Sequence, residues 1–366
     1  MIYLDYPSHT PVDPEVLTEF CRIEQVFLAN PMSNHQAGQA ARAEFDRIIT
    51  TTAQLLGANP KELIFTSGAT ESNNLAINGI THAGRHNGRH IITNALEHQS
   101  VSGPIAVLKD LGYDVEFVDI LPDGTIDLGH LQSLLRTDTI LLTVPWVDSE
   151  LGVIQPIKEI AGLLENYPNC RFHVDAAQAV GKLPVSFNLG QKGPHTLSFS
   201  PHKFHGLCGS GGLLCREAFL SLPHRGTPTL ALAAASLKAL ELAITGQAEH
   251  HQKVWQLRQY VLENLKDRVR VNSPVDPTKS SPYILNLSVP GIKGADFQAA
   301  LNSHGICVSV KSACAAPQTP SRPVYAISRD KKNAMNSWRL GFSHNTEISE
   351  IEDFLSAFDK CNKELV

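Results

Sequence analysis

Residues 172–178 read Phe-His-Val-Asp-Ala-Ala-Gln, an apolar run that ends in a carboxylate followed by small residues. This pattern predicts a buried strand whose end carries polar groups. Further short apolar runs predict strands at residues 63–66, 90–93, 115–118, 139–144, 196–199 and 212–214. Helical patterns lie between several of them, including residues 41–56, 70–80 and 157–164. Strands that alternate with crossover helices predict an α/β fold built on a mostly parallel, seven-stranded sheet.

The last third of the chain has a different pattern. It predicts a long polar helix at residues 252–266, strands at 283–289 and 306–310, and a closing helix at 347–361. These elements indicate a smaller α+β domain, in which we also expect the first residues of the chain. The predicted division is a large domain at residues 15–250 and a small domain formed by residues 1–14 and 251–366.

Composition excludes several classes of protein. Of the 366 residues, 42% are hydrophobic and 18% charged, which is typical of a globular protein and not of a disordered chain. A formal charge of −5 argues against nucleic acid or anionic membranes as partners, since both require a basic face. No apolar run is long enough for a transmembrane helix and the N-terminus has no signal-peptide pattern, so we expect a cytoplasmic protein. The seven cysteines include no CxxC pair, which leaves neither a disulfide framework nor a zinc site supported.

Two strand ends carry residues suited to a bound anion or ring. Ser67-Gly68-Ala69-Thr70-Glu71-Ser72 leads from a strand straight into a helix, as a phosphate site requires, but it is also compatible with an ordinary helix start in which Thr70 is the N-cap. Asp175 at the next informative strand end is placed to bind a ribose, a metal or a pyridine nitrogen, or to cap a helix. Neither motif is specific by itself.

A lysine stands at a third strand end, in Ser198-Phe199-Ser200-Pro201-His202-Lys203. At the carboxyl edge of a sheet, where ligands of such folds bind, Lys203 is placed to form an imine with an aldehyde cofactor. Ser200 and His202 are candidates to hold its phosphate. His202 and His205 do not indicate a metal site, because no carboxylate or cysteine follows at ligand spacing.

Together these stretches resemble the cofactor motifs of class V, fold-type-I enzymes that use pyridoxal 5′-phosphate (PLP), and within them the NifS/IscS-type cysteine desulfurases. The resemblance extends over nearly the whole chain, including Glu97-His98 and the stretch from Glu150 to Gln155. The resemblance implies a homodimer and a Schiff base at Lys203. It implies that Asp175 contacts the pyridine nitrogen, that Gln178 contacts the ring oxygen, and that His98 stacks on the ring and takes part in proton transfer. The phosphate contacts that it implies are Ala69, Thr70, Ser200 and His202, with Thr227 reaching the phosphate of the neighbouring subunit.

One cysteine has a setting that suits a nucleophile. Cys314 lies among small residues and prolines, which indicates an exposed loop, and Lys311 and Arg322 nearby would favour its thiolate. The stretch resembles the loop on which the family's cysteine becomes a persulfide. The same resemblance assigns Arg339 to the substrate carboxylate and Asn30 and Ser149 to the substrate side of the site.

The implied reaction removes sulfur from L-cysteine, gives L-alanine, and passes the sulfur from Cys314 to an acceptor protein such as an iron–sulfur scaffold. The sequence departs from the family at Trp146, at Asp148 and Ser149 in place of two asparagines, at Gly341, and in the shortened segment before Thr227. These departures leave open a selenocysteine lyase, another class V aminotransferase or lyase, or a protein that binds PLP with little catalysis.

Overall fold

The computed structural model describes residues 1–189, 193–216, 229–311 and 319–365. Its large sheet has seven strands in the order β2-β8-β7-β6-β5-β3-β4. Only β8 runs antiparallel to its neighbours, so the predicted mostly parallel, seven-stranded sheet is confirmed. The strands are β2 (Leu63–Thr66), β3 (His90–Asn94), β4 (Asp114–Val118), β5 (Thr139–Pro145), β6 (Arg171–Asp175), β7 (Thr196–Phe199) and β8 (Gly211–Cys215).

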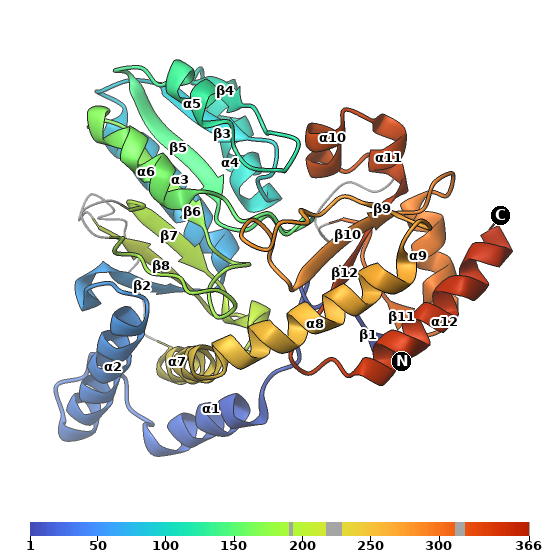
Figure 1. Cartoon of the computed structure of the whole chain (residues 1–366). Coiled ribbons are helices and arrows are strands. Elements are labelled where there is room, and N and C mark those ends of the chain that lie inside the picture. The colour runs from blue at the N-terminus through green and yellow to red at the C-terminus, as the bar shows by residue number, and fades with distance from the viewer. Residues whose placement is uncertain (190–192, 217–228, 312–318, 366) are drawn as a thin grey trace.

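Helices lie against this sheet and beside it (Figure 1). The central strands β5 and β7 are buried at every residue, as expected for a sheet covered on both faces. The helices of this part are α1 (Pro14–Val26), α2 (Gln36–Leu55), α3 (Ala69–Gly84), α4 (Gln99–Asp110), α5 (Leu128–Leu134), α6 (Ile157–Leu163) and α7 (Leu230–Thr245). Sequence periodicity did not single out α7, because its alanine-rich sequence is apolar around most of its circumference and packs against both α1 and α2.

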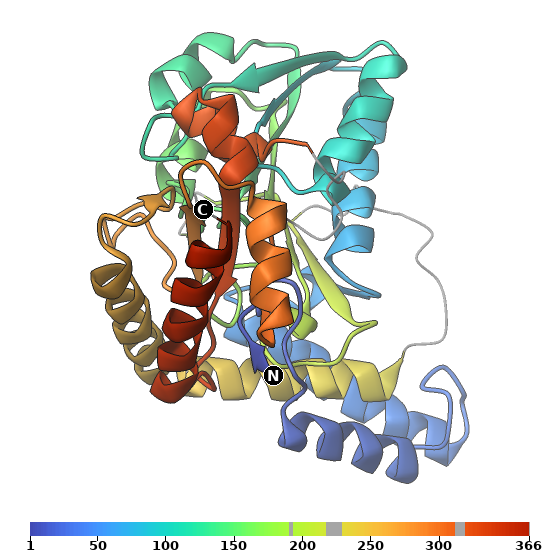
Figure 2. The same ribbon diagram turned by 90° about the vertical axis from the view of Figure 1, so that its right-hand side faces the viewer.

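A second sheet is built from β9 (Arg270–Val271), β10 (Ile284–Ser288) and β12 (Ser337–Gly341), with β10 in the middle. Trp338 of β12 packs against Phe297 of α9 (Gly294–Ser303) and Phe354 of α12 (Ile348–Leu365). The two helices lie side by side in Figure 2. The other helices of this part of the molecule are α8 (Gln247–Leu265), α10 (Arg322–Ser328) and α11 (Lys331–Asn336).

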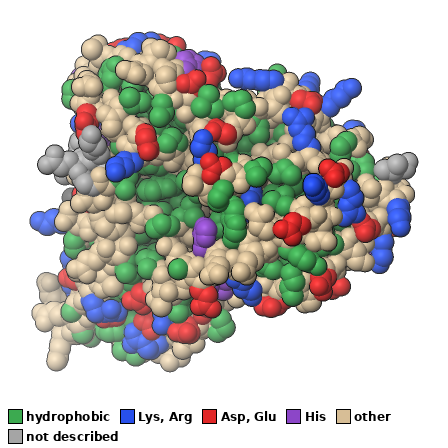
Figure 3. Space-filling view, viewed as in Figure 1, with side chains coloured by type: hydrophobic (Ala, Val, Ile, Leu, Met, Phe, Trp, Pro, Cys, Tyr) green, Lys and Arg blue, Asp and Glu red, His purple; other side chains and the backbone are tan. Residues whose placement is uncertain are grey.

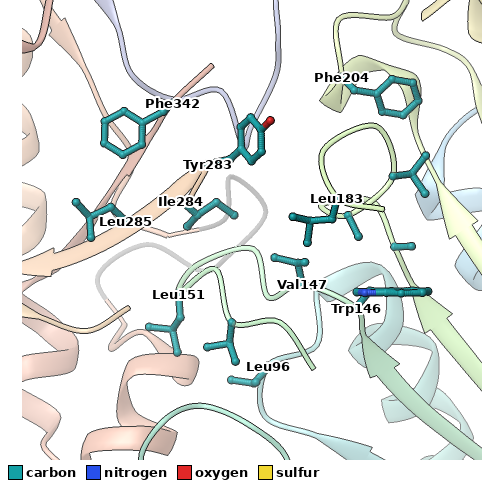
Figure 4. Packing of buried hydrophobic residues seen from close by; sticks show 14 of the residues in the cluster. Leu96, Trp146, Val147, Leu151, Leu183, Phe204, Tyr283, Ile284, Leu285 and Phe342 are labelled. Atoms are coloured by element: carbon teal, nitrogen blue, oxygen red, sulfur yellow. The ribbon is translucent and has the colours of Figure 1, made fainter. Parts of the chain in front are cut away.

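The first residues of the chain join this part of the molecule. Strand β1 (Ile2–Tyr3) pairs in parallel with β11 (Ile306–Cys307). The predicted strand at 306–310 is therefore shorter than expected, and the predicted domain boundary at residue 250 falls inside α8. One apolar cluster extends across both sheets: Figure 4 shows Trp146 and Val147 after β5, and Tyr283, Ile284 and Leu285 at β10.

Charge is distributed without a dominant patch on the face in Figure 3, where acidic and basic side chains are interspersed. Among the described residues, no helix has the length and apolar character needed to cross a bilayer.

Three histidines from separate segments meet beside α8. His250 of α8 stacks on His344, with ring centroids 3.8 Å apart, and His205 meets His344 edge-on at 4.7 Å. His205 also bonds Ser343 Oγ at 2.9 Å. His250 is only partly exposed, because the His344 ring covers one face of its own ring.

This cluster predicts acid sensitivity of the fold. Burial, with His205 and His250 adding to it, lowers the pKa of His344 to about 3. In the unfolded chain, a histidine has a pKa near 6.5. Below about pH 6.5 the unfolded chain therefore binds a proton at His344 that the folded chain does not bind, so the free energy of unfolding decreases as the pH falls. His344→Phe is expected to reduce the loss of unfolding free energy between pH 7 and pH 5 by on the order of 1 kcal/mol in denaturant titrations. His86→Gln, at an exposed histidine, is the control, and equal pH dependence in both variants would contradict the prediction.

Candidate active site

The carboxyl ends of β6 and β7 and the first turns of α3 and α4 surround a cavity of about 330 Å³. Ten of the residues predicted for the site line it: Ala69, Thr70, His98, Ser149, Asp175, Gln178, Ser200, His202, Lys203 and Arg339. They come from six separate segments of the chain. The fold therefore brings together side chains that are far apart in the sequence, up to the 270 positions between Ala69 and Arg339.

Lys203 ends a short 3₁₀ turn, Pro201–Lys203, that follows β7 directly. Its amine donates to the carbonyl oxygens of Pro7 and Ser8, at 2.7 and 2.8 Å. Thr10 holds the same N-terminal segment in place, because its backbone N–H and its hydroxyl both donate to the His202 carbonyl. The N-terminal segment thus forms one wall of the cavity and orients the lysine.

Asp175 is buried at the end of β6, and its two carboxylate oxygens have different partners. Oδ1 accepts from the Ala177 backbone N–H at 3.0 Å, and Oδ2 accepts from the Asn73 amide at 2.8 Å. Asn73 Oδ1 then accepts from His173 Nε2 at 3.0 Å, while Thr196 Oγ1 lies 2.9 Å from His173 Nδ1. Burial lowers the pKa of His173 to about 4, so the ring is neutral and fixes the orientation of the Asn73 amide.

His98 is the N-cap of α4, and its Nδ1 accepts from the Ser100 backbone N–H. The Ser100 hydroxyl accepts from Asn73 at 2.9 Å and so is free to donate to the same Nδ1, 2.8 Å away. With Nδ1 used as an acceptor, the proton of the neutral ring resides on Nε2. Burial lowers the pKa of His98, which favours this neutral form.

Small residues allow close approach of the backbone where α3 begins. Gly68 is the N-cap and the helix starts at Ala69, so the expectation that Thr70 is the N-cap is wrong. A Cβ on Gly211 would lie 2.4 Å from Gly68 Cα, and β8 can pass this close only because residue 211 is glycine. Ser200 Oγ lies 2.8 Å from His202 Nδ1, and burial lowers the pKa of His202 to about 4. A helix N-terminus with a serine and a neutral histidine beside it is suited to an anion.

Arg339 of β12 is fully buried and reaches the cavity from the second sheet. Its guanidinium donates to Asp5 at 2.8 Å, to the Ser8 hydroxyl at 2.9 Å and to the Ser149 carbonyl at 2.5 Å. The preceding Asp148 is also buried, and burial together with Glu150 raises its pKa to about 7. Its Oδ2 accepts from the Glu150 and Leu151 backbone N–H groups, so it shapes the turn that presents Ser149.

A second, larger cavity of about 650 Å³ adjoins the first, because His98 and Ser149 line both. Lys311, Arg322 and Glu97 are among its other residues. Arg322 donates to the Glu97 carbonyl at 2.7 Å, and burial raises the pKa of the Glu97 carboxyl to about 8. The Lys311 amine donates to the carbonyl and the hydroxyl of Thr319, at 2.8 and 2.9 Å.

Some predicted residues are not placed in this cavity. Cys314 and Thr227 lie outside the described residues. Asn30 is exposed in the turn between α1 and α2, where it accepts from the Met32 backbone N–H, and it does not line the cavity. Sequence reasoning missed Pro7, Ser8, Asn73 and Cys208. Asn73 directly follows the stretch from Ser67 to Ser72, which was the one available signal, whereas the backbone carbonyls of Pro7 and Ser8 carry no signal in the sequence.

Comparisons with known proteins agree with this geometry. The aminotransferase class-V family model matches residues 2–225 and 220–354. A NifS/IcsS protein homolog of Lactobacillus delbrueckii subsp. bulgaricus is 33% identical, over 98% of this chain and 97% of that protein. A cysteine desulfurase IscS of Dictyoglomus turgidum is 31% identical, over 100% of this chain and 95% of that protein. A solved NifS-like protein superposes over the full length of both chains with a TM-score of 0.91 and 27% identity.

The chain therefore belongs to the aminotransferase class-V family, and its similar proteins within that family are of the NifS/IscS type.

Proposed function

We propose that this protein is a PLP-dependent cysteine desulfurase, which converts L-cysteine to L-alanine and holds the released sulfur as a persulfide on Cys314. The observation that carries the proposal is the convergence of the Lys203 amine, the Asp175 carboxylate and the Arg339 guanidinium on one cavity of about 330 Å³. An imine-forming amine, a partner for a pyridine nitrogen and a clamp for an α-carboxylate are the three groups that an amino-acid PLP enzyme needs.

The residues present fit the cofactor. The buried Asp175 would hold the pyridine nitrogen, Gln178 the ring oxygen, and His98 the ring face. Ala69, Thr70, Ser200 and His202 surround the N-terminus of α3, where backbone N–H groups favour a phosphate. When bound, PLP supplies an electron sink that stabilises negative charge at the α-carbon of an amino acid. We propose that Thr227 contributes to the phosphate site of the other subunit in a homodimer.

The chain's own groups then divide the work. Arg339 would bind the substrate carboxylate, with Ser149 beside it and Asn30 at the substrate side in the assembled homodimer. Lys203 would take the proton from the α-carbon, and His98 Nε2–H would hold or move a proton near the sulfur. Cys314 would approach through the larger cavity, which Lys311 and Arg322 line. These two cations would favour its thiolate, which would attack the substrate sulfur. The terminal sulfur of the persulfide would then pass to an acceptor, for which we propose an iron–sulfur scaffold protein in the cytoplasm.

The experiment that tests the proposal uses the PLP-loaded protein, L-cysteine as substrate, and two readouts: free alanine and protein-bound sulfane sulfur. Wild-type protein is expected to produce both. Cys314→Ser is expected to lose the bound sulfane sulfur and to release alanine at least about tenfold more slowly, because the nucleophile is gone. Cys208→Ser, at a cysteine that lines the smaller cavity, is the matched control and should retain both products.

Two outcomes would contradict the proposal. Bound sulfane sulfur that persists in Cys314→Ser and disappears in Cys208→Ser would move the persulfide to Cys208. A wild-type protein that releases alanine only from L-selenocysteine would instead indicate a selenocysteine lyase.

A further inference from the structure

A buried lysine adjoins the site and has no part in the proposed reaction. Lys182 is 6% exposed, and among the described residues no carboxylate forms an ion pair with it. Burial, with the charges of Lys203 and Arg339 adding to it, lowers its pKa to about 7. A buried cation without an acidic partner costs folding free energy, so packing alone does not account for a lysine at this position.

Hydrogen bonds connect Lys182 to the N-terminal segment that forms one wall of the cavity. Its amine donates to Gln178 Oε1 at 2.7 Å, across four residues of the turn that follows β6. Gln178 Nε2 donates to the Pro7 carbonyl at 2.8 Å, and that carbonyl also accepts from Lys203 at 2.7 Å. Lys182 is thus connected to the Schiff-base lysine through one amide and one carbonyl.

This connection settles which end of the Gln178 amide faces the site. An amide can turn by 180° and exchange its donor for its acceptor at little cost when both ends find partners. A protonated lysine only donates, so it is satisfied by Oε1 and not by the NH₂ group. As long as Lys182 occupies its position, the NH₂ end is the one directed toward Pro7 and the cavity.

We propose that Lys182 is a positioning residue, which holds the Gln178 amide with its NH₂ group toward the cofactor and thereby lowers the proton affinity of the Schiff base at Lys203. The inference rests on the proposed PLP function. A donor facing the ring oxygen, with a positive charge behind it, stabilises the deprotonated ring oxygen and the unprotonated Schiff base next to it. Loss of Lys182 removes the charge and leaves the orientation of the amide to its bond with the Pro7 carbonyl alone, and both effects raise the Schiff-base pKa.

The test is a pH titration of the Schiff-base absorbance of the resting, PLP-loaded protein, with no substrate present. Lys182→Met has a similar length and no donor. It is expected to raise the proton affinity of the Schiff base by at least about threefold. Gln178→Leu is expected to give a similar shift. The shift of the double variant should be smaller than the sum of the two single shifts, because both changes remove the same contact.

Thermal unfolding separates this role from a purely structural one. Lys182→Met is expected to change the melting temperature little, because removal of a buried charge offsets the loss of its bond to Gln178 and its contact with the Tyr283 ring. A lower melting temperature with an unmoved titration would show a structural tether and overturn the inference, as would shifts that add in the double variant. Lys182→Gln introduces a shorter, uncharged side chain that can still donate, so it is expected to shift the Schiff-base pKa by less. This variant replaces Lys182→Met in the titration if the methionine variant does not fold. A wild-type protein with no Schiff-base absorbance would refute the proposed function itself.

Discussion

Lys203→Ala is expected to abolish covalent cofactor binding and to lower alanine release from L-cysteine by roughly a thousandfold or more, because the amine would serve both as imine partner and as base. Lys182, the buried lysine beside the site, is not expected to replace it. In the turn after β7, the Lys203 amine donates to the Pro7 and Ser8 carbonyls, whereas the Lys182 amine donates to Gln178. The measurement is PLP content after gel filtration, followed by alanine release.

Lys203→Arg is the matched control for this prediction. Arginine keeps the positive charge and can donate to the same two carbonyls, but a guanidinium does not form a stable imine. It should therefore retain the melting temperature of the wild type and still lose covalent PLP and turnover. Substantial activity in Lys203→Arg would show that the charge, and not the imine, is what the site requires, and would contradict the assignment of Lys203.

The second large effect is expected at Asp175. Asp175→Asn keeps the shape of the side chain and removes its charge, so the pyridine nitrogen would lose the partner that keeps it protonated. Alanine release should fall by roughly a hundredfold, a change of about 3 kcal/mol in transition-state stabilisation. Steady-state kinetics at saturating PLP measures this effect, and PLP content confirms that the site is still occupied.

A neighbouring hydroxyl provides the control for Asp175. Ser198 Oγ lies 3.5 Å from the same carboxylate, at the limit of hydrogen-bond distance, so Ser198→Ala should change alanine release by only a few fold. An equal loss in Ser198→Ala and Asp175→Asn would indicate that the local packing is sensitive and that the carboxylate charge has no special role.

The sheet could be predicted from the sequence because its strands are short apolar runs bounded by turns. The predicted bounds of β2 and β7 agree with the structure, and those of β3 to β6 and β8 differ by one residue at one or both ends. The prediction was weaker where the chain is apolar without a period, as in α7, and where pairing depends on a distant strand, as in β11. In both cases the tertiary contact, and not the local pattern, decides the element.

The residues proposed to bind the cofactor follow the same division. Lys203, Asp175 and the start of α3 could be predicted because each stands at a strand end, and parallel strands deliver their carboxyl ends to one edge. His98 and Arg339 required resemblance to a known family, since neither has a local pattern that distinguishes it from a structural residue. Asn73 could not be ranked above its neighbours, because its role is a contact with Asp175 across 102 residues.

By itself, then, the sequence determined the parallel sheet, the edge at which ligands bind, and the lysine and carboxylate that stand there, because periodicity and strand ends are local properties. Only the tertiary structure decided how these groups are oriented. Backbone carbonyls at Pro7 and Ser8 hold Lys203, the His173–Asn73 pair holds Asp175, and Lys182 fixes the Gln178 amide. These are contacts between distant segments, whose distance and direction depend on how the chain packs, and no local pattern of residues records them.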